Sequence, residues 1–251
     1  MRWYRITATA ILCLFAGLAS AQPGTNLSFT LSSKYVSRGV NTVNNWVMQK
    51  STELHFGNLT ASLWGNMDLT NHNGSAYTRS KPAGTFTEWN LVLEYATTWR
   101  SLQVALGWIE YQYPGTGWER TREAYLSLSV DAPLSPNVTI YRDTGVAGGF
   151  YATAGVEVPI QRSLSMSAQV GWGCPKFNAY YYGSESASWV DATFGLSTTL
   201  DAGRGWQIKV SVTARVGLKG RRLANTKNIS RTTRHPTGGK PCHNCSCVYQ
   251  K

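Results

Sequence analysis

The stretch WQIKVSVTARVG, residues 206–217, alternates strictly between apolar and polar side chains. The even-numbered positions from Trp206 to Val216 are apolar, and the odd-numbered positions from Gln207 to Arg215 are polar. Successive side chains of a β-strand point to opposite faces of its sheet, so the pattern predicts a strand with one apolar and one polar face. Which of these faces meets water decides the class of protein.

The same alternation recurs along most of the chain. One face of each expected strand carries residues such as Leu, Phe, Val or Ala, and the other carries Ser, Thr, Asn or a charged residue. A composition rich in Gly, Ser, Thr, Trp and Tyr also suits strands better than helices. Eleven strands are legible, over residues 26–40, 46–56, 59–69, 86–96, 102–113, 122–131, 137–143, 148–158, 164–172, 188–200 and 206–218.

Two antiparallel architectures fit this alternation. In a soluble, secreted sandwich the apolar faces pack together as the core, whereas in an outer-membrane barrel they meet lipid and the polar faces line a lumen. Several expected strands have ten residues or more. Strands of soluble proteins usually have about 5–6 residues, and a tilted membrane strand needs about 9–11. Strand length therefore favours the barrel.

The connections between the expected strands also differ in length. The two longest, residues 70–85 and 173–188, fall at the same end of the sheet, and the other end has only tight turns. Outer-membrane barrels show this asymmetry, with short periplasmic turns and longer outer loops. We therefore expect an all-β fold, a transmembrane antiparallel up-and-down β-barrel over residues 22–218.

Charged residues follow the polar face of the expected strands. Glu110, which shares its face with Trp108, is the exception, and it lies near a strand end, where a lipid-side charge costs only about 0–1 kcal/mol. Acids outnumber bases on the polar face, so an open pore should have a mild preference for cations. The residues expected to line the lumen are Lys34, Glu53, Asp68, Glu88, Glu94, Glu123, Tyr125, Tyr151, Glu157, Lys209 and Arg215.

The start of the chain has the features of a secretory signal peptide. Arg2 and Arg5 give a positive start, an apolar run follows, and Ala19-Ser20-Ala21 fits a small-residue cleavage site. We expect residues 1–21 to be removed on export. No later stretch is long and apolar enough for a transmembrane helix.

The net charge of +11 is unevenly distributed. Two bases belong to the signal peptide and nine lie from Arg215 to Lys251, where no acid occurs. Residues 22–214 hold thirteen bases and thirteen acids. The body of the protein therefore lacks the basic bias of a nucleic-acid-binding domain, and we expect no nucleic-acid partner.

Five phrases of the sequence combine strand and turn patterns. They are SKYVSRGV (33–40), ASLWGNMDL (61–69), EYQYPGTG (110–117), REAYLSLSVDAPLSPNVTIYRD (122–143) and GVEVPIQRSLSMSAQVGWG (155–173). Together they resemble the TorF-type porins, which are outer-membrane β-barrels of Gram-negative bacteria, over residues 26–218. The resemblance implies a barrel of twelve strands with both chain ends in the periplasm, and it supplies no catalytic residues.

The chain departs from the family pattern at its end. Residues 219–251 are basic and show no alternation, although a closing strand with a terminal aromatic residue is expected there. An open barrel would leave unpaired strand edges in lipid, at several kcal/mol for each free N–H or C=O group. We therefore expect about twelve strands, of which eleven are legible, and hypothesise a frameshift near residues 217–222.

The candidate metal and catalytic motifs are weak. Cys242, His243, Cys245 and Cys247 are possible zinc donors, but they fall within six residues and no second knuckle holds them apart, so no metal is predicted. Cys174 stands alone in an outer loop and is expected to be a free thiol.

A hydrolase needs a nucleophile, a histidine and an acid. His55 lies on the same expected face as Glu53, and no serine is marked out as the nucleophile. No enzymatic activity and no cofactor are therefore expected, and an envelope barrel hydrolase is the weakest alternative.

The sequence thus predicts an outer-membrane, porin-like barrel for passive diffusion of small hydrophilic solutes, in contact with outer-membrane lipid. The main alternative is a non-conducting barrel whose outer loops, residues 70–85 and 173–188, bind a partner or a surface.

Overall fold

The computed structural model describes residues 24–71, 82–161, 163–203 and 206–218. The expected signal peptide and the basic tail, with its cysteine cluster and its hypothesised frameshift, lie outside the described residues, as does most of the expected loop 70–85. Within the described part of the chain, no helix is both long enough and apolar enough to cross a membrane.

One antiparallel sheet of eleven strands dominates the fold, and each strand pairs with the next along the sheet. The prediction of an antiparallel meander from the alternation is confirmed. The strands are β1 (Gly24–Ser32), β4 (Val47–Phe56), β5 (Leu59–Asp68), β6 (Thr85–Trp99), β7 (Leu102–Gln112), β8 (Thr121–Val130), β9 (Asn137–Asp143), β10 (Phe150–Gln161), β11 (Leu164–Gly173), β12 (Ser188–Gly203) and β13 (Trp206–Gly217).

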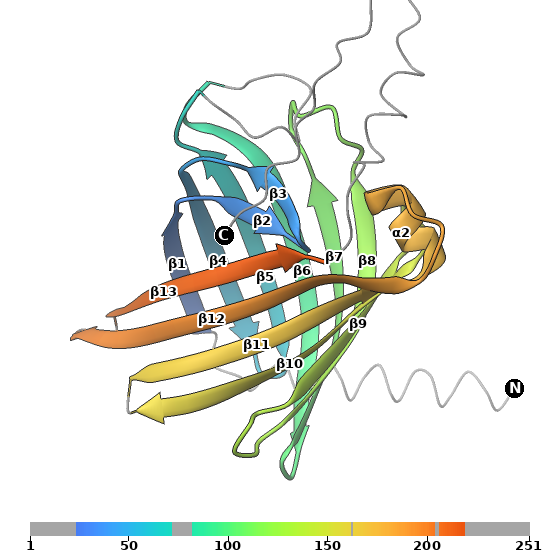
Figure 1. Ribbon diagram of the computed structural model, residues 1–251. Helices are drawn as coiled ribbons and strands as arrows, with labels where there is room; N and C mark the ends of the chain where they lie inside the picture. Colours follow the sequence, from blue (N-terminus) through green and yellow to red (C-terminus); the bar gives the residue numbers. More distant parts are fainter. Residues whose placement is uncertain (1–23, 72–81, 162, 204–205, 219–251) are drawn as a thin grey trace, which may run out of the picture.

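The two ends of the sheet differ in the length of their connections. At the tight-turn end, two residues separate β4 from β5, β6 from β7, β10 from β11 and β12 from β13, and six residues, 131–136, separate β8 from β9. At the opposite, long-loop end, residues 33–46, 69–84, 113–120, 144–149 and 174–187 connect the strands. Figure 1 shows that the sheet is curled and that the short strands β2 (Tyr35–Ser37) and β3 (Val40–Val43) lie inside the curve.

The expected first strand, residues 26–40, is wrong in its second half. β1 ends at Ser32, and a separate hairpin of β2 (Tyr35–Ser37) and β3 (Val40–Val43) follows. The turn of this hairpin lies at Arg38 and Gly39, whose φ angles are 46° and 72°. Two successive residues with positive φ make the tight turn typical of a two-residue hairpin. Tyr35 therefore leaves the apolar face on which the alternation placed it.

The expected loop 173–188 contains a short helix, α2 (Pro175–Tyr182), which the sequence analysis did not predict. Proline at its first position suits a helix start, and Gly183, with φ of 66°, ends it in the left-handed conformation. The helix packs near β10, and its Phe177 and Tyr182 form a small core with Tyr151 and Val190.

The burial of the two sheet faces is the reverse of that in a soluble sheet. Large apolar side chains on one face are exposed on nearly every strand, up to 74% for Val212. Among the described residues, the buried set contains twelve polar or charged side chains and seven apolar ones. The buried side chains gather at the long-loop end of the polar face, where the hairpin and α2 lie.

Candidate functional site

The hairpin β2–β3 lies across the polar face of the sheet and contacts strands that are far apart in sheet order. The hydroxyl of Tyr35 donates a hydrogen bond to Glu88 of β6 at 2.9 Å. The guanidinium of Arg38 reaches β8, and Arg215 of β13 donates to the carbonyl of Val36. The hairpin therefore spans the curve of the sheet from β6 to β13.

The turn of the hairpin fits closely against β12 and β13. A Cβ atom added at Gly39 would lie 2.8 Å from Cβ of Asp191 and 3.5 Å from Cα of Gly217. Because the backbone at Gly39 also has positive φ, only glycine suits this position without strain. The close approach fixes how deeply the turn enters the curve.

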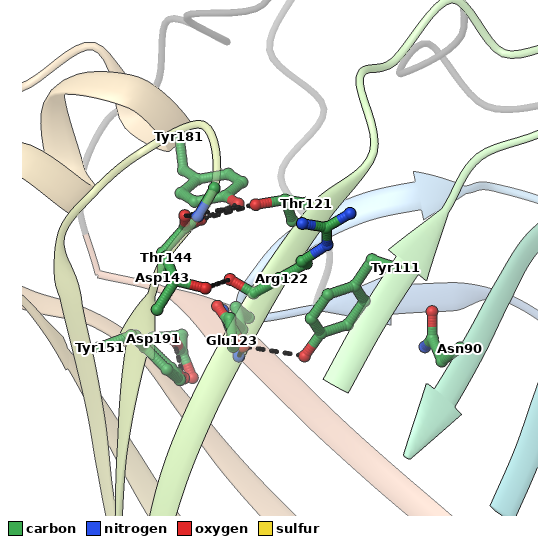
Figure 2. Close-up of polar contacts among 12 residues, drawn as sticks. Asn90, Tyr111, Thr121, Arg122, Glu123, Asp143, Thr144, Tyr151, Tyr181 and Asp191 are labelled. Atoms are coloured by element: carbon green, nitrogen blue, oxygen red, sulfur yellow. Dashed lines mark hydrogen bonds and ion pairs between the residues drawn. The ribbon is translucent and has the colours of Figure 1, made fainter. Parts of the chain in front are cut away.

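Arg38 and Glu123 form the central contact of the site. Both guanidinium nitrogens, Nη1 and Nη2, donate to the two carboxylate oxygens of Glu123 at 2.6 Å. The Glu123 side chain is only 1% exposed, and the hydroxyl of Tyr111 donates a third hydrogen bond to it at 2.8 Å. Figure 2 shows Glu123 on β8 with Tyr111 directed toward it. A bidentate pair of this kind is both strong and geometrically specific.

Three aromatic rings surround the same guanidinium. Its central carbon lies 4.4 Å from the ring centre of Tyr151, 4.8 Å from that of Tyr141 and 5.5 Å from that of Phe177. We call Glu123, Tyr111 and these three rings the Arg38 cage. Cations over aromatic faces within about 6 Å are stabilised by the ring quadrupole.

The surroundings of the hairpin keep Arg38 charged and the Tyr35 hydroxyl neutral. Burial by itself lowers the pKa of Arg38, but the adjacent Glu123 raises that pKa well above its usual value. Burial, and then the charge of Glu88, raise the pKa of the Tyr35 hydroxyl well above its usual value. Arg38 therefore remains a cation, and Tyr35 remains a neutral donor to Glu88.

Asp143 anchors the loops next to the cage. It accepts hydrogen bonds from the hydroxyls of Thr121 at 3.1 Å and Tyr181 at 3.0 Å, and from the backbone N–H of Gly145 at 2.8 Å. Figure 2 shows Tyr181 of α2 and Thr121 of β8 converging on Asp143. These contacts hold helix α2 over the ends of β8 and β9.

A third polar cluster lies where β5 meets β6. Asn66, Asp68 and Thr87 are fully buried and are joined by hydrogen bonds of 3.0–3.2 Å. A register shift between Asn66 and Met67 places both Thr87 and Glu88 on the polar face. Bulges of this type re-aim side chains, and this one brings Glu88 to Tyr35.

The tight-turn half of the polar face is more open. There Asn26, Glu53 and His55 contact one another, with 3.5 Å between His55 Nε2 and Glu53. Nδ1 of the same histidine lies 3.0 Å from the hydroxyl of Thr60. These contacts place His55 in a polar cluster, and they do not by themselves indicate a catalytic role. Among the described residues, no group of three or more His, Cys, Asp or Glu side chains is placed to hold a metal ion.

The register of the sheet places ten of the eleven expected lumen residues on its polar face. Lys34 is the exception, because it lies between β1 and β2 rather than on a strand. The ten are Glu53, Asp68, Glu88, Glu94, Glu123, Tyr125, Tyr151, Glu157, Lys209 and Arg215. The structure brings Glu88, Glu123, Tyr151 and Arg215 to the hairpin, and it keeps Glu94 with Tyr125 nearer the tight-turn end.

Sequence reasoning missed Arg38, the residue that organises the site. The only local signal was the pair Arg38-Gly39, which can form a turn. Glu110 is on the apolar face, as its alternation predicts, and there it lies 3.5 Å from Arg122 of the neighbouring strand.

Among the described residues Cys174 has no disulfide partner, and the other cysteines lie outside the described residues. Burial opposes its ionisation, but hydrogen bonds from backbone N–H groups, first that of Phe150 at 3.0 Å, lower the pKa of Cys174 overall.

Because the thiolate is the reactive form, the rate at which iodoacetamide modifies Cys174 should rise with pH and reach half its maximum below the ordinary thiol pKa of 9.0. Mass spectrometry of its tryptic peptide at several pH values measures this, and a midpoint at or above 9.0 would contradict it.

Comparison of the chain with known protein families, with curated proteins and with solved structures gave no match.

Proposed function

We propose that the protein is an outer-membrane β-barrel of the TorF porin type that lets small hydrophilic solutes diffuse through a narrow, polar lumen. The observation that carries this proposal is the reversed burial of the sheet. The apolar face is exposed on strands from β1 to β13, whereas the buried side chains of the polar face are mostly hydrophilic. Lipid around the apolar face and water inside the curl satisfy both faces.

A soluble sheet with this surface would be very unfavourable. On β11 and β12, Met166 lies opposite Leu196, and all of Met166, Phe194 and Leu196 are about half exposed or more. Burying one such side chain is worth about 1.5–3 kcal/mol, and soluble monomers rarely expose apolar patches larger than a few hundred Å². This apolar face continues across the whole sheet, which favours a lipid environment.

The charges on the apolar face support the same proposal. They lie toward the long-loop end, where Lys50 lies 5.3 Å from the ring centre of Phe86 and Arg142 lies 4.5 Å from that of Phe150. Glu110 and Arg122 pair with each other at the same end. A belt of charged and aromatic side chains is typical of the edge of a lipid-facing band.

The hairpin would then be the constriction of the pore. It occupies the long-loop half of the lumen, and the polar residues of the tight-turn half line a wider vestibule. Glu53, Glu94 and Glu157 outnumber Lys209 in that half, and Glu123 is already paired with Arg38. We therefore propose small solutes and a mild preference for cations.

Channel recordings on two forms of the protein test the proposed function. One form is the unaltered chain, and in the other residues 33–46 are replaced by Gly-Gly-Asn-Gly. We expect small cation-preferring steps from the first and a conductance about threefold larger or more from the second, because the constriction is gone. A heat-modifiability gel on each form verifies that a folded sheet is being recorded.

The same recordings address the main alternative, a non-conducting barrel with a binding surface. The position of the hairpin and α2 at the long-loop end, among the buried side chains of the polar face, favours this second function. It predicts that the unaltered protein folds and does not conduct, and that the loop-replaced form does conduct. If the unaltered protein folds and does not conduct, the diffusion function is wrong, and conduction by the loop-replaced form alone then supports the alternative.

A further inference from the structure

We propose that the Arg38 cage is a binding site for guanidinium groups and that the chain's own Arg38 is its tethered occupant. Once the Arg38 side chain is removed, the cage should accept solutes with a planar guanidinium, such as arginine, arginine-containing peptides and alkylguanidines. The proposal concerns binding, so it stands apart from the proposed diffusion function.

The residues of the cage also contact one another and neighbouring residues without Arg38. Tyr111 donates to Glu123 at 2.8 Å, and Tyr151 donates to Asp191 at 2.9 Å. The rings of Tyr151 and Phe177 are stacked, with their centres 5.2 Å apart. These residues come from β7, β8, β10, β12 and α2, whereas Arg38 comes from the separate hairpin, 85 residues from Glu123 in sequence. None of these contacts is made by Arg38 itself.

The shape of the cage selects a guanidinium over an ammonium. Two donors meet the two carboxylate oxygens at 2.6 Å in a flat fork, and three ring centres lie within 5.5 Å of the central carbon. A planar, weakly hydrated cation can satisfy both the carboxylate fork and the aromatic faces at once. An ammonium ion is a compact, strongly hydrated point charge, and it can do only part of this.

The backbone at Arg38 indicates that the side chain, and not the turn, accounts for arginine at this position. Its φ of 46° is in the left-handed region, which costs an ordinary residue about 1–2 kcal/mol and glycine almost nothing. Arg100, in the turn between β6 and β7, has a similar φ of 56°, but its side chain is exposed and, among the described residues, lies over the ring of Trp99 alone. The two arginines thus share a backbone conformation and differ in whether a cage surrounds them.

The test is chemical rescue of Arg38→Gly, which empties the cage and relieves the backbone. The folded protein in detergent is heated with methylguanidinium chloride, methylammonium chloride or potassium chloride at equal concentrations, and the midpoint of unfolding is read from heat-modifiability gels. We expect the substitution to lower the midpoint and methylguanidinium to restore about half of the loss or more, saturably, once its concentration is about tenfold above its Kd. Methylammonium should restore less than about a fifth, because it lacks the planar fork.

Two further variants decide between the cage and a general salt effect. Arg100→Gly makes the same change in the same backbone conformation, so methylguanidinium should not shift its midpoint. Arg38→Gly combined with Glu123→Gln should lose the rescue. If Arg38→Gly does not refold alone, its refolding yield with each salt becomes the measurement. The proposal is overturned if methylguanidinium does no better than methylammonium, or if the rescue persists without the Glu123 carboxylate. Because no conductance is measured, a failure of the diffusion function leaves this result unaffected.

Discussion

The substitution Leu196→Arg should prevent stable folding, whereas Ser197→Arg should be tolerated. Leu196 lies near the middle of β12 on the apolar face and is 46% exposed, and its neighbour Ser197 points to the polar face. An arginine on the lipid face near the bilayer midplane costs about 2–4 kcal/mol, and one in a hydrated lumen does not carry that cost. The folded fraction of Leu196→Arg and Ser197→Arg after refolding into lipid vesicles measures the difference.

The same pair of variants separates the barrel from a soluble sheet. On a soluble protein, an arginine at a half-exposed surface position usually changes stability by no more than about 0.5 kcal/mol. Equal folded fractions for the two variants, or a monomer that stays in solution without detergent, would remove the basis for a lipid-facing surface. The unaltered protein, refolded in parallel, gives the reference fraction.

The strands could be predicted from the sequence because each one carries its own signal. Period-two alternation depends only on neighbouring residues, and it located β9 at residues 137–143 without error. It also placed Glu110 on the apolar face and ten of the expected lumen residues on the polar face. Pairing followed from the short turns, since strands joined by two residues pair with each other.

The site could be predicted only in part, because its key contacts are long-range. Glu123 and Tyr151 were expected on the polar face, but nothing local indicated that Arg38 would reach them, although Glu123 alone is 85 residues away in the sequence. The alternation of β1 also ran on into Tyr35, so the hairpin was hidden within a predicted strand. Helix α2 was missed because eight residues within an aromatic loop give too weak a periodic signal.

Removing the Glu123 carboxylate should destabilise the protein far more than removing a similar carboxylate elsewhere on the polar face. In Glu123→Ala, Arg38 keeps its charge among the aromatic rings and loses both of its 2.6 Å hydrogen bonds to the carboxylate oxygens. Leaving one partner of a buried ion pair uncompensated costs about 3–5 kcal/mol. Because the Arg38 side chain is 21% exposed, we expect a loss near the lower end, about 3 kcal/mol, in the free energy of unfolding.

Glu94→Ala is the matched control. Glu94 also accepts a hydrogen bond from a tyrosine, Tyr125, at 2.5 Å, but no ion pair is recorded for it among the described residues. Its removal should cost about 1.5 kcal/mol, the lower end for a single hydrogen bond to a charged group, because the half-buried Tyr125 hydroxyl can bind water instead. Urea unfolding of both variants in detergent micelles measures the difference. Equal losses would mean that the hairpin is held by its backbone and apolar contacts, and that the charge pair contributes little to its position. A larger loss for Glu123→Ala, together with larger channel steps, would instead make this one carboxylate the group that keeps the hairpin across the lumen.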